Sequence, residues 1–169
     1  MIQNFYKKAC PQCLQSSCYR RGITALEMLF VVSVLGILFA IILPQFSKIK
    51  ENQVMKNATG EIISALHNAQ SQSLASLDSI EYGVHFQSDK VIIFKGKIFS
   101  AEAEDNKIVN IILPASISDV TLNGASSTTG DIYFERLSGV PDKIGTITVS
   151  TSSMSKIITI SATGAVSLN

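Results

Sequence analysis

The chain has 169 residues, which suits one domain of ordinary size with an appendage. Hydrophobic residues make up 46% of it and charged residues only 16%, a bias that usually reflects a membrane segment. The net charge of +1 conceals an asymmetry. Four basic residues and no acidic residue precede Ile23, whereas the remainder has ten basic and thirteen acidic residues and a net charge of −3. The part from Ile23 onward is therefore not basic enough to indicate nucleic-acid binding.

The first 22 residues form a short basic segment that contains all three cysteines. Its charged residues are Lys7, Lys8, Arg20 and Arg21. Cys10 and Cys13 have the separation of a zinc-ligand pair, but the sequence supplies neither a second pair nor a nearby histidine. We therefore expect reduced cytosolic thiols and no metal site. Because no cysteine follows Cys18, the folded part must be stable without disulfides.

A long apolar run extends from Ile23 to Leu43. Its only polar or charged side chains are those of Thr24, Glu27 and Ser33. About 20 such residues span a bilayer as a helix, and the upstream basic residues place the amino terminus in the cytoplasm and the remainder outside. A secretory signal would end in a small-x-small cleavage site, which is missing here. An uncleaved single-pass anchor is the alternative, but it gives no reason for the Glu27 carboxylate, which is costly in lipid.

The segment RGITALEMLFVVSVLGILFAIILPQF resembles the amino-terminal signature of type IV prepilins and type II secretion pseudopilins. In that family an inner-membrane peptidase cuts the leader after a glycine and usually methylates the new amino terminus. The fifth mature residue is a glutamate, and a proline follows near the twenty-second. The resemblance implies a leader over residues 1–22 that is cleaved after Gly22. Ile23 is then the first mature residue and the methylation site, Glu27 the fifth residue, and Pro44 the twenty-second.

The resemblance also implies a role for Glu27. Cleavage after Gly22 frees an ammonium group at Ile23, about 6 Å along the helix axis from Glu27. In a filament the Glu27 carboxylate would pair with the ammonium group of a neighbouring subunit, and a paired carboxylate is tolerated in apolar surroundings. The implied partners are prepilin peptidase, other pilin or pseudopilin subunits in a hetero-oligomeric filament, and the bacterial inner membrane. The alternative is a Glu27 side chain at the membrane edge that points toward water.

The helix need not stop at the end of the apolar run. We expect residues 23–44 to form a transmembrane or filament-core helix with a kink at Pro44, followed by an amphipathic helix over residues 45–77. Apolar residues recur there at three- and four-residue spacing, which predicts a stripe that packs on a sheet. The stripe consists of Val54, Ala58, Ile62, Ala65, Leu66 and Ala69. Gly60 slightly lowers the stability expected for this helix.

Residues 78–169 are expected to form a β-rich domain. From Ile80 the hydrophobic period falls to two, and the predicted strands are IEYGVHF, KVIIFKG, KIVNIIL, DVTL, DIYFER, TITVS, KIITISA and GAVSL. Residues 102–106 and 123–130 lack this pattern and are predicted to be exposed loops. The predicted class is α+β and pilin-like, with a long amino-terminal helix packed on an antiparallel sheet.

The carboxy-terminal segment from Ile132 to Leu168 resembles the end of GspH/FimT-type minor pseudopilins. In these proteins an aromatic strand leads to a Gly-x-Pro loop, and a final hairpin ends in Gly-x-Val. The matching residues are Phe134, Gly139, Pro141, Gly164 and Val166. The resemblance implies a minor structural subunit of a type II secretion pseudopilus or type IV pilus. A tip subunit of a DNA-uptake pilus is the alternative, although the last thirty residues hold only Lys143 and Lys156 as basic side chains.

No motif predicts an enzyme. The sequence has no Gly-x-Ser-x-Gly, HExxH or phosphate-binding loop. His67 and His85 have no partner at metal-ligand spacing and are interpreted as surface or half-buried residues. The acidic group Glu102, Glu104 and Asp105 does not match the calcium loop of an EF-hand and is interpreted as a solvated loop. We therefore expect no catalytic residue, no metal and no cofactor.

Overall fold

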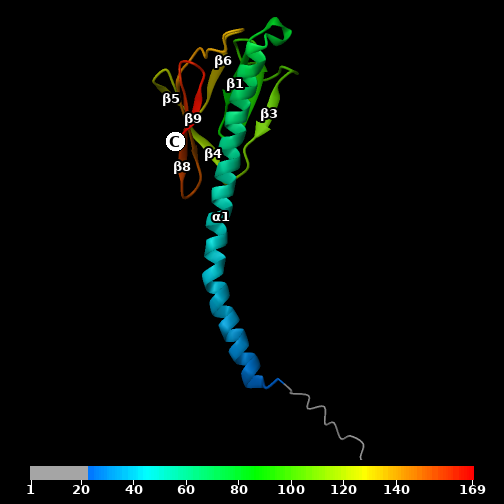
Figure 1. The fold of residues 1–169 in the computed structure, drawn as a ribbon, viewed down its shortest axis with the longest axis vertical. Coiled ribbons are helices and arrows are strands. Elements are labelled where there is room, and N and C mark those ends of the chain that lie inside the picture. Colours follow the sequence, from blue (N-terminus) through cyan, green and yellow to red (C-terminus); the bar gives the residue numbers. More distant parts are fainter. Residues whose placement is uncertain (1–22) are drawn as a thin grey trace, which may run out of the picture. The chain divides into compact units, whose positions relative to one another are not determined.

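A computed structural model describes residues 23–169 and divides the chain into two compact units, with the boundary between Ile41 and Ile42 (Figure 1). One helix, α1 (Ala25–Leu74), precedes all the strands. Its backbone stays helical through Pro44, so the two expected helices are one element, which ends at Leu74. The kink expected at Pro44 stays a prediction.

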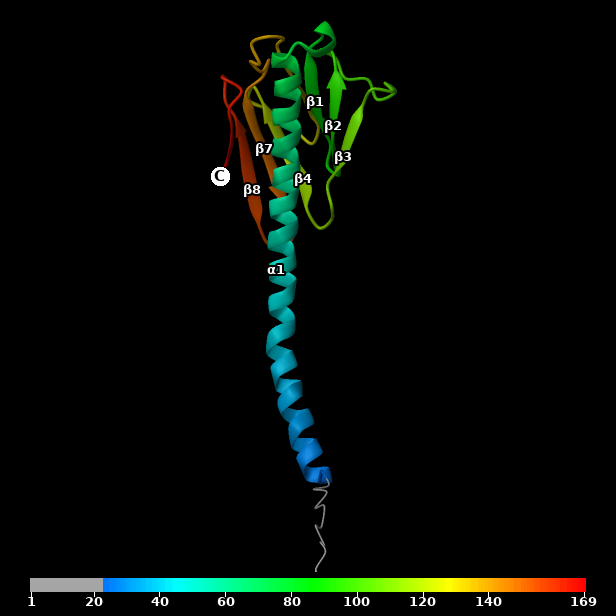
Figure 2. The same cartoon turned by 45° about the vertical axis from the view of Figure 1, so that its right-hand side comes forward.

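Two antiparallel sheets follow the helix, where the sequence predicted one (Figure 2). The first has the strand order β3-β2-β1-β6 and contains β1 (Tyr82–Phe86), β2 (Lys90–Lys95), β3 (Lys107–Asn110) and β6 (Gly130–Phe134). The second has the order β5-β4-β7-β8-β9 and contains β4 (Ser116–Leu122), β5 (Ala125–Ser127), β7 (Gly145–Ser150), β8 (Ser155–Ile160) and β9 (Val166–Leu168). A 3-10 turn, η1 (Leu77–Ser79), joins α1 to β1. The predicted α+β class is confirmed.

The apolar stripe of α1 packs into the core of the second unit. Ala58, Ile62, Ala65, Leu66 and Ala69 are buried, as predicted, and Val54 is half-buried against them. They share one cluster with the inward-facing residues of both sheets, among them Val84, Phe86, Ile147 and Ile158. Each fully buried aliphatic or aromatic side chain contributes about 1.5–3 kcal/mol. The carboxy-terminal part of α1 is therefore an integral part of the domain.

Two glycines meet at the carboxy-terminal end of α1. Gly139, between β6 and β7, and Gly164, between β8 and β9, have φ angles of 65° and 80°. Gln70 Nε2 on α1 donates a hydrogen bond of 3.0 Å to the Gly139 carbonyl oxygen. A Cβ atom on Gly164 would lie 2.3 Å from that nitrogen and 2.8 Å from that carbonyl. Both glycines that the sequence singled out are thus required by backbone conformation and close approach.

The prediction of an exposed loop over residues 123–130 is wrong in part, because β5 lies within it. Asn123 and Gly124 have φ angles of 49° and 82°, and Leu122 pairs with Ala125 across them. Two consecutive positive φ angles form the tight turn of a two-residue hairpin. All three residues of β5 are exposed, which explains why no apolar alternation marks the strand. Residues 102–106 contain no strand, as predicted, and all of them except the half-buried Asn106 are exposed.

The β3–β4 connection lies three residues earlier in the chain than the sequence predicted, because β3 ends earlier and β4 begins earlier. β3 ends at Asn110, although the Ile111 N–H still donates to the Asp89 carbonyl oxygen at 2.8 Å, in register with the pairing of Asn110 and Lys90. Ile112 and Leu113, expected within the strand, are 68% and 80% exposed. The connection therefore leaves two large apolar side chains exposed.

Candidate assembly segment

The first turn of α1 is capped by Thr24. The Glu27 N–H donates to Thr24 Oγ1 at 3.2 Å, and the Met28 N–H donates to the Thr24 carbonyl oxygen at 3.1 Å. Thr24 is thus the N-cap, and Glu27 occupies the third helical position, the place of the acid in a Thr-x-x-Glu capping box. Sequence reasoning assigned no role to Thr24, although the Thr-x-x-Glu spacing was visible.

An exposed apolar surface follows the cap. The window Ala25–Ile42 is long and apolar enough to cross a membrane, and none of it is buried. Its large side chains include Leu26, Leu29, Phe30, Val32, Ile37, Phe39 and Ile41, each between 59% and 79% exposed. A continuous apolar surface of this length is unfavourable in water, and it is compatible with a single membrane span.

Two of the predicted site residues, Ile23 and Glu27, lie at this helix start. Gly22 lies outside the described residues, as do Cys10, Cys13 and Cys18. Ile23 is not helical and is exposed next to the cap, while Glu27 is exposed one turn further on. Cleavage after Gly22, methylation of Ile23 and pairing of Glu27 are not tested by this arrangement and stay predictions.

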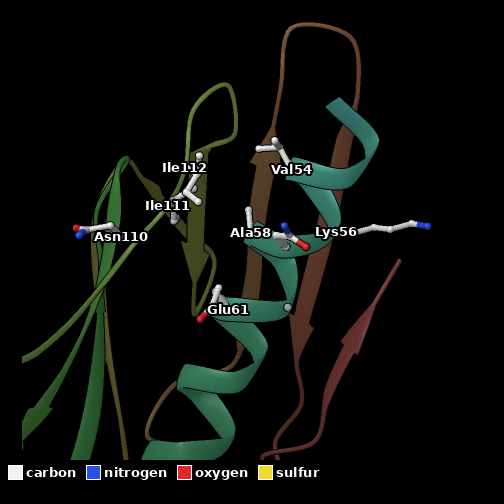
Figure 3. Close-up of a pocket in the computed structure, with 9 residues that line it drawn as sticks. Val54, Lys56, Ala58, Glu61, Asn110, Ile111 and Ile112 are labelled. Atoms are coloured by element: carbon white, nitrogen blue, oxygen red, sulfur yellow. The ribbon is translucent and has the colours of Figure 1, made fainter. Parts of the chain in front are cut away.

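A groove lies between α1 and the β3–β4 connection (Figure 3). It has a volume of about 370 Å³, and its apolar wall is formed by Val54 and Ala58 of α1 and by Ile111 and Ile112 of the connection. Lys56 and Glu61 also border it, and neither forms an ion pair within residues 23–169. The groove lacks a cluster of titratable groups and offers an apolar side chain a place to bind.

His85 has contacts that the sequence did not reveal. Its Nδ1 atom lies 2.5 Å from Asp131 Oδ1 on β6, and Gln87 Nε2 lies 3.1 Å from its Nε2 atom. The ring of Phe99, in the β2–β3 loop, stacks on the imidazole with 3.9 Å between centroids. No serine or cysteine of residues 23–169 is hydrogen-bonded to His85. The histidine holds the loop against the outer face of the sheet, and His67 is exposed on α1.

The β7–β8 turn is attached to α1 through Glu51. Ser152 Oγ donates a hydrogen bond of 2.9 Å to Glu51 Oε1, and Ser153 Oγ donates to Oε2. The hydrogen bond from Ser153, and then that from Ser152, holds the pKa of Glu51 below its ordinary value. Both hydrogen bonds favour the ionised carboxylate, so the attachment depends on pH.

Lys95 pairs with two aspartates, Asp78 of η1 and Asp105 of the acidic loop between β2 and β3. Lys95 Nζ lies 3.0 Å from Asp78 Oδ2 and 3.5 Å from Asp105 Oδ2. The hydrogen bond from Lys95 lowers the pKa of Asp78, and the same contact raises the pKa of Lys95. No group of three potential ligands among residues 23–169 is placed to hold a metal ion.

Comparisons of the chain with protein-family models, with curated proteins and with solved structures found no match. An α+β protein with one long, apolar amino-terminal helix and antiparallel sheets is compatible with a pilin-like layout.

Proposed function

We propose that this chain is a filament subunit of the prepilin class, most similar to GspH/FimT-type minor pseudopilins. It is made as a single-pass precursor in the bacterial inner membrane, with its carboxy-terminal domain outside, and is cut after Gly22 by prepilin peptidase. It then assembles with other subunits into a type II secretion pseudopilus or a type IV pilus. The observation that carries this proposal is an apolar, unburied amino-terminal part of α1, Ala25–Ile42, that nevertheless has a carboxylate, Glu27, in its first turn.

Glu27 could stabilise the start of the helix or pair with a charge on a neighbouring subunit, and the free energies of the two interactions decide between these roles. An acidic side chain near a helix amino terminus is stabilising by about 0.3–1 kcal/mol. A charge within lipid costs about 2.5–3.5 kcal/mol at the bilayer centre and less toward its edge. Once the helix moves from the membrane edge into an apolar filament core, the stabilisation of Glu27 by the helix dipole is smaller than the free-energy cost of burying its charge. The ammonium group at Ile23 of a neighbouring subunit supplies the missing counter-charge.

Two substitutions separate helix capping from charge pairing. Glutamine completes a capping box as glutamate does, so Glu27→Gln keeps the cap and removes the charge. Thr24→Ala removes the cap at a cost of about 1 kcal/mol and keeps the charge. We expect Glu27→Gln to be processed but excluded from filaments, whereas Thr24→Ala is incorporated. Incorporation of Glu27→Gln together with exclusion of Thr24→Ala would mean that Glu27 serves to cap the helix.

The direct test is intact mass and amino-terminal sequencing of the protein from its native membrane. An amino terminus at Ile23, about 14 Da heavier if methylated, is the expected result. An amino terminus at Met1 on all molecules would mean that the helix is a permanent anchor, and the filament proposal would be rejected.

A further inference from the structure

A second, smaller apolar cluster lies on the outer face of the first sheet. Val91 and Ile93 of β2 belong to the core cluster. Successive residues of a strand point to opposite faces, so Ile92 and Phe94 lie on the outer face. They are nevertheless only 5% and 2% exposed. The Phe94 ring lies across β1, because a Cβ atom on Gly83 would be 2.4 Å from its Cζ atom. This outer apolar surface therefore has a cover of its own.

The cover comes from the β2–β3 connection, of which residues 97–105 are called the strap. The Phe99 ring of the strap contacts the Phe94 ring edge-on, with 5.6 Å between centroids and an interplanar angle of 66°. The same Phe99 ring stacks on the His85 imidazole at 3.9 Å and is almost parallel to it. Both nitrogen atoms of this imidazole have hydrogen-bond partners, which fix its plane. Phe99 thus fills a site that is shaped for one planar ring.

Few other contacts attach the strap to the domain. Within the described part of the chain, its backbone hydrogen bonds stay inside the β2–β3 connection. Its other contacts involve charged side chains that are largely exposed. Lys97 lies 3.7 Å from Glu81 and 5.6 Å from the centroid of the Tyr133 ring, and Asp105 lies 3.5 Å from Lys95. Exposed ion pairs contribute little to stability. A segment with so few buried contacts and backbone hydrogen bonds opens more easily than the core.

The residues at the two ends of the strap favour its movement. Gly96 has a φ angle of 97°, which glycine adopts at little cost, and no heavy atom lies within 4 Å of its Cβ position. At the other end, Asn106 Nδ2 donates a hydrogen bond of 2.7 Å to the Ser100 carbonyl oxygen. The buried Oδ1 atom of Asn106 has no hydrogen-bond partner within residues 23–169. Such an atom is unfavourable in the closed position, and water would satisfy it once the strap opens.

We propose that the strap is a lid, which opens and closes over the outer face of the first sheet while the rest of the domain stays folded. Gly96 and Asn106 are its hinges. In the closed position the Phe99 ring is held between the rings of His85 and Phe94. Opening withdraws Phe99 and uncovers both rings, so the closed protein hides an aromatic surface that the open protein exposes. The inference does not depend on the proposed function, because every contact it uses lies within the first sheet and the β2–β3 connection.

Native-state proteolysis of the full-length chain in detergent micelles tests the lid, with mass spectrometry to identify each cut. Chymotrypsin binds an aromatic side chain in an apolar slot, so it can cut after Phe99 only when that ring has left the sheet. If the strap opens locally, the rate of this cut should be independent of urea below the unfolding transition, once corrected for the protease's own loss of activity. Cuts after Phe86 and Phe134, which are fully buried in β1 and β6, should require global unfolding. A cut after Phe99 with the same urea dependence as the cut after Phe86 would overturn the proposal.

His85→Ala gives a second readout, because it removes one of the two rings that hold Phe99 and leaves the strap itself unchanged. Loss of one aromatic stack should make the cut after Phe99 about two- to tenfold faster. His67→Ala is the matched control, because His67 is exposed on α1 and its loss should not change the rate. An unchanged rate for His85→Ala, or an equal acceleration by His67→Ala, would contradict the proposed role of the stack. If cuts after Phe86 reveal that His85→Ala has unfolded the domain, the urea dependence of the unaltered chain decides.

Discussion

Gly164→Ala should strongly destabilise the carboxy-terminal domain. At a φ of 80°, alanine costs roughly 1–2 kcal/mol in backbone strain alone. The new Cβ would lie 2.3 Å from Gln70 Nε2 and 2.8 Å from the Gly139 carbonyl oxygen. Relief of that contact breaks the hydrogen bond between Gln70 and Gly139, which contributes about 0.5–1.5 kcal/mol. We expect a total loss of about 2–3 kcal/mol of unfolding free energy from these two causes.

The loss is measurable by urea unfolding of the full chain in detergent micelles. Tyrosine fluorescence suits this purpose because Tyr82 is buried and Tyr133 is half-buried in the first sheet. With a urea dependence of about 1–3 kcal/mol per molar, the midpoint should fall by about 1 M or more. An unchanged midpoint would refute the reasoning that the close approach of Gly164 to Gln70 constrains this position.

Gly60→Ala is the matched control, because it adds the same methyl group where nothing opposes it. Gly60 is exposed in the middle of α1, and no heavy atom lies within 4 Å of the Cβ position. Alanine is favoured over glycine in a helix interior by about 1 kcal/mol, so the urea midpoint should rise. A fall in the midpoint would mean that Gly60 has a backbone role that its surroundings do not reveal.

Three further outcomes are expected. Glu27→Ala should leave cleavage largely intact and reduce recovery in sheared filaments, and full recovery would remove the pairing role. Gly22→Val should block cleavage, as judged by the precursor mass, and a normally processed variant would contradict the peptidase assignment. Because the folded-state pKa of Glu51 is lowered from 4.5, its hydrogen bonds to Ser152 and Ser153 stabilise the fold above that pH and are lost as pH falls through the folded-state value. The protection factors of amides in the β7–β8 turn, which correct for the intrinsic pH dependence of exchange, should therefore fall in acid, and an equal fall after Ser152→Ala and Ser153→Ala substitution would exclude Glu51 as the cause.

The sequence predicted those parts of the fold that local periodicity determines. Ala58, Ile62 and Leu66 repeat with the helical period and are buried, and the alternation in β1 and β7 marked both as strands. Local periodicity does not determine how strands distribute between sheets, because β1 pairs with β6 across a long stretch of chain. The division into two sheets was therefore not predicted.

Missed features fall into two kinds. The Asn123-Gly124 hairpin and the Thr24 cap were encoded by short motifs, and closer attention to turn and cap residues could have found both. The contact between His85 and Asp131 depends on strand register across 46 residues and left no local signal. The groove beside Ile112 depends equally on where the β3–β4 connection returns to α1.

The attachments of α1 to the domain determine which part of the helix can change its conformation without unfolding the core. Residues from Met55 to Ala69 contribute buried side chains to the core, so unwinding there would expose apolar surface at about 25 cal/mol per Å². Glu51 is the first residue of the helix that hydrogen-bonds to a strand connection, through Ser152 and Ser153. Upstream, Gly36 and Pro44 are the residues with the poorest helix propensity, and proline also lacks the N–H that a helix interior uses. Any rearrangement of α1 that leaves the domain intact is therefore confined to residues before Glu51, which Ser152 and Ser153 hold by hydrogen bonds.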